Sequence, residues 1–514
     1  MTGRRNRVDA IATALAADRL GVPAVVYFVL SAAAPLTVVA GVITTGYAVT
    51  GITGLPIAFL AVGAVLALFS VGYVTMARHM VNAGAFYAYI AQGLGRPAGV
   101  GAAWVALIGY NALQVGLYGA LGAAASPLID QWFGMRPAWW LVALVGWMLV
   151  GILGLMRVEV NGIILAVLLT AEIAVILLFD VADLMNPAGG TITTTTLSPD
   201  ALLAPGVGAL LVIGTTGFVG FESSVVFSEE SRNPRRTVPV ATFLSVAIIA
   251  GLYALSSWAM TVGIGPGKIV EVARRDGAET VFRLATAHLG STVVDTARAL
   301  FVTSVIAAMI SFHNTTARYI FALGRERVLP AVFGRTSLRT GAPKAGSIAQ
   351  SVLGLAVILF YAAFGLDPLV QLFFYGGTFG SFGVLLLVAA TSVSVVVFFA
   401  RRPTGENAWR RVVAPTAATI ILLVIVYLAV ANFATLLGVG NASPLRWILP
   451  GAYAVAIALG LVWALILRAT RPNVYAGIGL GAKAATGQMT DAAAEASTPS
   501  HARPDGRHAG RQHR

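Results

Sequence analysis

One apolar run of the chain contains Gly214-Thr215-Thr216-Gly217-Phe218-Val219-Gly220-Phe221-Glu222-Ser223-Ser224. Each of its three glycines costs a helix interior about 1 kcal/mol relative to alanine, so we expect the helix to open here. Opened backbone at membrane depth is tolerated only where protein or a cavity meets its free N–H and C=O groups. Glu222 costs at least about 2.5 kcal/mol at that depth and should face a bundle interior or a watery cavity. The stretch therefore predicts half of a binding site for a small solute.

The composition indicates the class of protein. The 514 residues are 58% hydrophobic and only 11% charged, whereas ordinary soluble domains carry about 25% charged residues. Cysteine is absent, so neither a disulfide framework nor a thiolate metal site is expected. The net charge of +13 lies in short basic clusters between apolar spans, which fits membrane orientation better than nucleic-acid binding.

Apolar stretches of roughly 20 residues, long enough to cross about 30 Å of hydrocarbon, recur along the chain. We therefore predict an all-α polytopic membrane protein with about twelve transmembrane helices. Most lysines and arginines fall on the side of the N-terminus, which predicts the cytoplasmic membrane with both termini in the cytoplasm. The approximate spans are 22–45, 54–76, 98–125, 138–156, 159–181, 203–228, 239–262, 292–321, 346–364, 368–399, 412–434 and 445–467.

Two segments are not spans. Residues 264–290 are charged at helix-like spacing and predict one short helix lying over the outer face as a candidate lid. Residues 469–514 have no apolar periodicity and predict a disordered cytoplasmic tail. Residues 1–21 are expected to form a cytoplasmic N-terminal segment.

The first span holds a second break. Pro35, in mid-helix, removes one backbone hydrogen bond and clashes with the carbonyl four residues back. A lone proline is often a plain kink, but spans one and six are the first members of two five-span halves. Broken helices at corresponding places in two halves are the best sequence indication of a transporter site.

Two glutamates lie well within the predicted hydrocarbon region. Glu172 is near the middle of span five with no basic residue within a helical turn. Desolvation disfavours its charged form, so it is our first candidate for a coupling proton site. The alternative is a structural carboxyl that stays protonated. Glu222 has either a proton-linked gating role or a hydrogen bond to a neighbouring span.

Three other polar residues within the predicted spans each allow two interpretations. His313 lacks nearby ligand partners, which argues against a metal, and is more often a buried hydrogen-bonding residue than a proton carrier. Asn111 and Gln114 offer side-chain amides to a solute or bridge helices. Neither a nucleotide-binding loop nor a catalytic constellation is present, so we expect no enzyme activity and no cofactor.

The chain contains the motifs Gly217-Phe218-Val219-Gly220-Phe221-Glu222-Ser223, Ala83-Gly84-Ala85-Phe86-Tyr87 and Gly324-Arg325-Glu326-Arg327. Together they resemble motifs of the amino acid-polyamine-organocation permeases. The stretch from Gly217 through Ser228-Glu229-Glu230-Ser231-Arg232-Asn233-Pro234 to Pro239 is similar to that family's sixth-helix signature. Ala83-Gly84-Ala85-Phe86-Tyr87 resembles the loop between its second and third helices. Gly324-Arg325-Glu326-Arg327 resembles the end of its eighth helix. The resemblance covers roughly residues 15–470.

The resemblance implies two inverted five-helix repeats, about 22–181 and 203–399, plus two extra helices at about 412–467, within a transporter domain of residues 22–468. Substrate would lie between the unwound parts of helices one and six. Here Ala32-Ala33-Ala34-Pro35-Leu36-Thr37 replaces a glycine-rich signature, so carboxylate donors would come from Leu36 and Thr37. The carbonyls of Thr216, Gly217 and Phe218 would receive an ammonium, and Phe218 or Phe221 would gate the pocket. The predicted substrate-binding residues are Ala33, Ala34, Leu36, Thr37, Asn111, Thr216, Gly217, Phe218 and Phe221.

In some relatives a helix-five lysine occupies a sodium position, and the resemblance assigns that place to Glu172. The predicted function is proton-coupled uptake of amino acids by alternating access, with Glu172 and Glu222 as the coupling residues. The predicted partners are an amino acid or related amine, protons and the lipid bilayer, without nucleic acid. The alternatives are an exchanger of amino acids or polyamines and, further away, a channel or membrane-bound enzyme.

Overall fold

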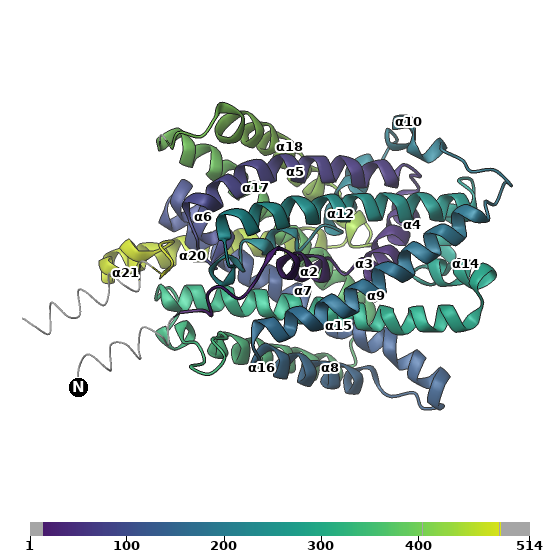
Figure 1. The fold of residues 1–514 in the computed structure, drawn as a ribbon, viewed down its shortest axis with the longest axis horizontal. Coiled ribbons are helices and arrows are strands. Elements are labelled where there is room, and N and C mark those ends of the chain that lie inside the picture. The colour runs from purple at the N-terminus through teal and green to yellow at the C-terminus, as the bar shows by residue number, and fades with distance from the viewer. Residues whose placement is uncertain (1–13, 403, 483, 485–514) are drawn as a thin grey trace, which may run out of the picture.

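The chain folds as a bundle of long helices with no β-strand in the part that the computed structural model describes, residues 14–402, 404–482 and 484 (Figure 1). The helices are α2 (Val22–Ala33), α3 (Pro35–Thr37), α4 (Thr44–Thr50), α5 (Leu55–His79), α6 (Ala85–Gly93), α7 (Arg96–Phe133), α8 (Trp139–Gly154), α9 (Val158–Met185), α10 (Pro199–Leu202), α11 (Val207–Thr216), α12 (Pro234–Ile264), α13 (Ile269–Asp276), α14 (Glu279–Leu289), α15 (Ser291–Arg325), α16 (Lys344–Ala363), α17 (Tyr375–Arg401), α18 (Ala414–Ala431), α19 (Phe433–Leu436), α20 (Leu445–Thr470) and α21 (Pro472–Gly477). Short 3-10 turns are η2 (Thr195–Leu197), η3 (Phe221–Ser224), η4 (Ser228–Glu230) and η5 (Ala331–Gly334), and π-helical turns are η1 (Val38–Ile43), η6 (Pro368–Phe374) and η7 (Trp409–Val413).

The predicted all-α membrane architecture is confirmed. Within the described residues, eleven helical segments are long and apolar enough to cross a membrane. The apolar α8 is shorter, with 16 residues, or about 24 Å at 1.5 Å per residue. It lies where the fourth of the twelve predicted spans was expected. Span one combines α2, α3, η1 and α4, and span six runs over Val207–Glu230.

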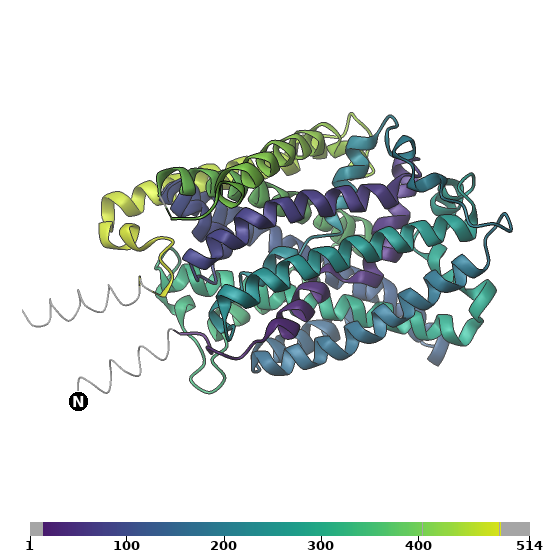
Figure 2. The same cartoon turned by 45° about the horizontal axis from the view of Figure 1, so that its top comes forward.

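The packing of the first ten spans follows a two-fold pattern. Span one (α2) contacts span seven (α12), and the corresponding pair in the other half, span six (α11) and span two (α5), is also in contact. The contact of α9 with α15 likewise corresponds to that of α17 with α7. Such exchange symmetry is expected of two structural repeats of five spans each. The added spans α18 and α20 lie along one edge of the bundle (Figure 2), where α18 packs on α5 and α17, and α20 packs on α7.

The segment predicted as a single lid helix forms two helices, α13 and α14, because Gly277 at φ 54° turns the chain between them. Figure 1 shows α14 near α4, at the end of the bundle opposite α6 and α21. The α13 helix packs on α4, and Arg274 Nε donates a hydrogen bond of 2.8 Å to the Ala48 carbonyl. The candidate lid is therefore attached to the last turns of span one.

The start of the predicted tail is structured, which corrects the prediction of disorder for that part. The α20 helix continues to Thr470, and α21 packs against it. Beyond α21, the backbone amides of Gly479 and Gly481 donate to the Glu326 carboxylate, which no reading of apolar periodicity could reveal. The rest of the predicted tail, residues 485–514, lies outside the described residues, as do residues 1–13 of the predicted N-terminal segment.

Candidate functional site

Span one breaks at Ala34, one residue before the proline. Ala34 adopts the left-handed conformation at φ 47° and ψ 68°, and Pro35 begins the second half of the span. A non-glycine residue in this region costs about 1–3 kcal/mol, so surrounding contacts must hold it there. The Tyr253 hydroxyl supplies one such contact by donating to the Ala33 carbonyl at 3.2 Å. The predicted break is therefore present.

Span six breaks at the glycine-rich stretch. The α11 helix ends at Thr216, and the chain continues through tight turns to Gly220, which has φ 110° and ψ −20°. Phe218 and Val219 donate backbone hydrogen bonds within the turn, to the carbonyls of Thr215 and Thr216. The turn itself therefore satisfies part of the opened backbone.

The two breaks touch each other. A Cβ atom added to Gly220 would lie 2.5 Å from Ala32 Cβ and 3.2 Å from the Ala33 nitrogen. Cβ atoms essentially never lie within 3.0 Å of a non-bonded atom, so only glycine fits at this crossing. The positive φ of Gly220 independently favours glycine. The sequence predicted the cost of these glycines, and the structure gives the reason for one of them.

Glu172 joins three elements at the first break. Its Oε1 accepts hydrogen bonds from the Leu36 amide at 2.5 Å and from the Ser304 hydroxyl of α15 at 2.7 Å. The Thr37 hydroxyl lies 3.2 Å from the Ser304 hydroxyl. The carboxylate thus caps the N-terminal end of the second half of span one, where helix amides favour negative charge. Glu172 is 1% exposed.

Glu222 plays a similar part at the second break. It is fully buried and accepts hydrogen bonds from the Tyr110 hydroxyl at 2.7 Å and from the Gly220 amide at 2.9 Å. Its own carbonyl accepts the Tyr73 hydroxyl at 3.0 Å. The residue therefore fastens the turn of span six to spans two and three. Both alternatives for Glu222, a gating role and a bond to a neighbouring span, agree with this geometry.

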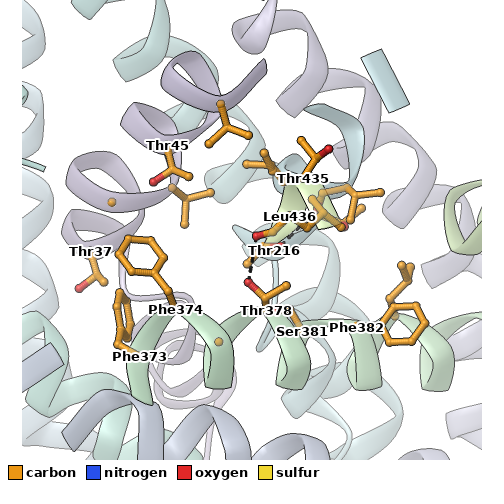
Figure 3. Close-up of a pocket in the computed structure, with 18 residues that line it drawn as sticks. Thr37, Thr45, Thr216, Phe373, Phe374, Thr378, Ser381, Phe382, Thr435 and Leu436 are labelled. Atoms are coloured by element: carbon orange, nitrogen blue, oxygen red, sulfur yellow. Dashed lines mark hydrogen bonds between the residues drawn. The ribbon is translucent and has the colours of Figure 1, made fainter. Parts of the chain in front are cut away.

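A pocket of about 110 Å³ extends from the breaks along span one, from Thr37 to Val49 of α4. Figure 3 shows the side chains that line it. Its walls come from the second half of span one, from α11, from η6 and α17, and from α19. Thr37 and Thr216 reach it from the two breaks, and Phe373 and Phe374 face them from η6.

Two of the nine predicted substrate-binding residues, Thr37 and Thr216, line this pocket. Phe218 and Phe221 line a smaller adjoining space of about 20 Å³ that shares Thr215, Ser381 and Leu385 with the first. Of the other five, Ala33, Ala34, Leu36 and Gly217 lie in or next to the breaks, and Asn111 lies within α7.

Some predicted residues have other partners. The Leu36 amide, predicted to meet a substrate carboxylate, donates to Glu172 instead. The side-chain amide of Asn111 donates to the Leu107 carbonyl of its own helix at 2.7 Å. His313 is buried with its Nε2 2.7 Å from the Ser347 hydroxyl, which agrees with a hydrogen-bonding residue.

Sequence reasoning missed two buried acids at the far end of α9. Asp180 and Asp183 are 4% and 3% exposed, and Asp180 accepts the Ser256 hydroxyl at 2.8 Å. The predicted span ended at residue 181, which placed Asp180 at the very end of the span and Asp183 in the following loop, whereas α9 continues to Met185. Their three-residue spacing, which places both on one helix face, was the available signal.

Ion pairs and hydrogen bonds close the opposite end of the bundle. Arg318 of α15 makes a buried two-bond pair with Glu230, at 2.6 and 2.9 Å, and Arg325 makes another with Glu229, at 2.7 Å for both bonds. Just beyond α15, Glu326 also accepts hydrogen bonds from Tyr87 and from Asn82. Burial raises the pKa of the Glu326 carboxyl to about 7, against the lowering effect of its hydrogen bonds.

Comparison with known proteins assigns the family. The sequence profile of the amino acid permeases matches residues 20–473. Cationic amino acid transporter 4 of Homo sapiens is 28% identical over 185 residues, which cover 35% of this chain and 26% of that protein. The chloroplastic cationic amino acid transporter 6 of Arabidopsis thaliana is 27% identical over 262 residues, or 50% and 41% of the two chains. The glutamate/serine transporter AimA of Bacillus subtilis is 22% identical over 161 residues, or 30% of each.

The aligned segments thus span well under half of the length of each of these relatives. The profile match, in contrast, includes every predicted span and both breaks. The names of these three relatives describe transporters. The chain is a multi-pass membrane protein that belongs to the amino acid permease family of the amino acid-polyamine-organocation superfamily.

Proposed function

We propose that this protein is a secondary active transporter that takes up amino acids across the cytoplasmic membrane, coupled to protons, by alternating access. Two broken helices that meet at one depth offer N–H donors to a substrate carboxylate and C=O acceptors to its ammonium. The family match and the pocket beside the breaks support this proposal.

The observation that carries the proton-coupling part is the position of Glu172. Its carboxylate joins span five to the Leu36 amide of span one and to Ser304 of span eight. An ionised carboxylate accepts both hydrogen bonds strongly, whereas a protonated one holds them less tightly. Gain or loss of one proton therefore changes how firmly the second half of span one is held against its neighbours.

Orientation completes the proposal. With both termini in the cytoplasm, the pocket faces the outside and the ion pairs of Arg318 and Arg325 close the inside. Binding of substrate and proton would be followed by closure of the outer pocket and separation of the inner pairs. Glu222 would hold the turn of span six during this movement through Tyr110 and the Gly220 amide.

The test is uptake by proteoliposomes under an imposed pH gradient, with Glu172→Gln as the perturbation. Glutamine keeps an acceptor for Leu36 and Ser304 but cannot ionise. We expect loss of gradient-driven accumulation with retained substrate binding. Glu159→Gln is the matched control, because Glu159 lies on the same helix in a partly exposed pair with Arg19 at 3.2 Å. Full accumulation by the Glu172 variant would remove this residue from the coupling mechanism.

A further inference from the structure

We infer that the substrate is a neutral amino acid with an apolar side chain, an inference that rests on the proposed function. The chemistry of the pocket walls favours such a side chain. Among the residues that the structure describes, none of those lining the pocket carries a charge. Phe373, Phe374 and Phe382, together with aliphatic side chains, form the apolar part of the lining.

The polar groups in the pocket are hydroxyls, and most of them have partners. Thr215 donates to the Val212 carbonyl at 2.6 Å, and Thr378 donates to the Leu436 carbonyl at 3.4 Å (Figure 3). The Ser381 hydroxyl is different, because it is buried and makes no hydrogen bond within the described part of the chain. Ser381 is 8% exposed and lines both the large pocket and the adjoining space. It is a free donor and acceptor for a bound solute.

A cationic substrate side chain would lack a counter-charge here. Glu172 and Glu222, the buried carboxylates at the two breaks, do not line the pocket, and both already accept hydrogen bonds from amide and hydroxyl donors. A buried ammonium or guanidinium without a partner costs far more than it gains from neutral hydroxyls. An anionic side chain meets the same problem, because the described lining offers no lysine or arginine. An apolar side chain carries no such cost and gains from burial against the phenylalanines.

This substrate class differs from the one in the names of the human and plant relatives, which are cationic amino acid transporters. A pocket that binds apolar amino acids excludes cationic ones because the charge of their side chain would be left unpaired, and not because of their size.

The experiment is counterflow in proteoliposomes, which requires exchange of substrate but no proton gradient. Vesicles preloaded with unlabelled leucine, phenylalanine, lysine, arginine or glutamate are tested for uptake of radiolabelled leucine and lysine. We expect leucine and phenylalanine to drive leucine uptake, with at least about tenfold less from lysine or arginine. Counterflow of lysine equal to that of leucine would overturn the inference and leave the proposed transport function standing. Absence of counterflow with every amino acid would overturn both.

A variant that introduces a charge tests whether the missing counter-charge is what excludes lysine. In Ser381→Asp, a carboxylate replaces the free hydroxyl, and we expect lysine counterflow to rise by about tenfold relative to leucine. Ser381→Asn introduces a neutral side chain of the same size as aspartate and should give no such rise. If the aspartate variant does not fold, Thr378→Asp on the same helix face supplies the charge. A lysine gain with the asparagine variant would contradict the electrostatic argument.

Discussion

Gly220→Ala tests the crossing of the two broken helices directly. The structure gives two separate costs. An alanine at φ 110° adopts a conformation that costs about 1–3 kcal/mol. Its Cβ would also lie 2.5 Å from Ala32 Cβ, and overpacking of this kind costs about 1–3 kcal/mol. We therefore expect a loss of about 2–6 kcal/mol in the free energy of unfolding.

The two costs can be separated by a second substitution. Ala32→Gly in the Gly220→Ala background removes the 2.5 Å contact and leaves the backbone strain. A double-mutant cycle should then give a coupling of about 1–3 kcal/mol between the two positions. Gly251→Ala is the matched control, because nothing lies within 4 Å of its added Cβ and alanine favours the α12 helix by about 1 kcal/mol.

The assay is unfolding of the purified protein in detergent, by heat and by titration with a denaturing detergent. The expected order of stability, from highest to lowest, is Gly251→Ala, wild type, the double variant and Gly220→Ala. Equal stability of Gly220→Ala and the wild type would refute the close crossing of the two breaks. Equal stability of the single and double variants would refute the contact with Ala32.

Two further predictions concern the end of the bundle closed by ion pairs. Burial raises the pKa of the Glu326 carboxyl from 4.5 to about 7, so its contribution to stability is full below about pH 4.5 and falls as the pH rises to about 7. The fall in melting temperature over this interval should therefore be smaller in Glu326→Gln than in the wild type. An unchanged pH profile of the melting temperature in this variant would contradict the role of Glu326. Glu230→Gln leaves Arg318 buried with a weakened partner and should lower the free energy of unfolding by about 3–5 kcal/mol. Glu279→Gln breaks the pair with Arg298, in which Glu279 is 49% exposed, and should cost under about 1 kcal/mol. Similar melting temperatures for the two variants would count against a strong contribution from the buried pair.

Local properties of the chain were sufficient to predict the spans and the breaks. Hydropathy over about 20 residues depends only on neighbouring residues, so the eleven long spans and the shorter α8 of the described chain could be located before any coordinates. Pro35 and the glycines around Gly217 weaken a helix wherever it packs, so the breaks could be predicted as well. Glu172 could be singled out because a carboxylate in an apolar helix needs a partner.

Only the tertiary structure decided which partners these residues have. The Leu36 amide that meets Glu172 is 136 positions away in the chain, and Ser304 is 132 positions away. The burial of Asp180 and the docking of Gly479 on Glu326 likewise come from packing between distant segments. Hydrogen bonds, close approaches and uncharged pocket walls are properties of pairs of surfaces, and a linear pattern of hydropathy does not encode which surfaces meet.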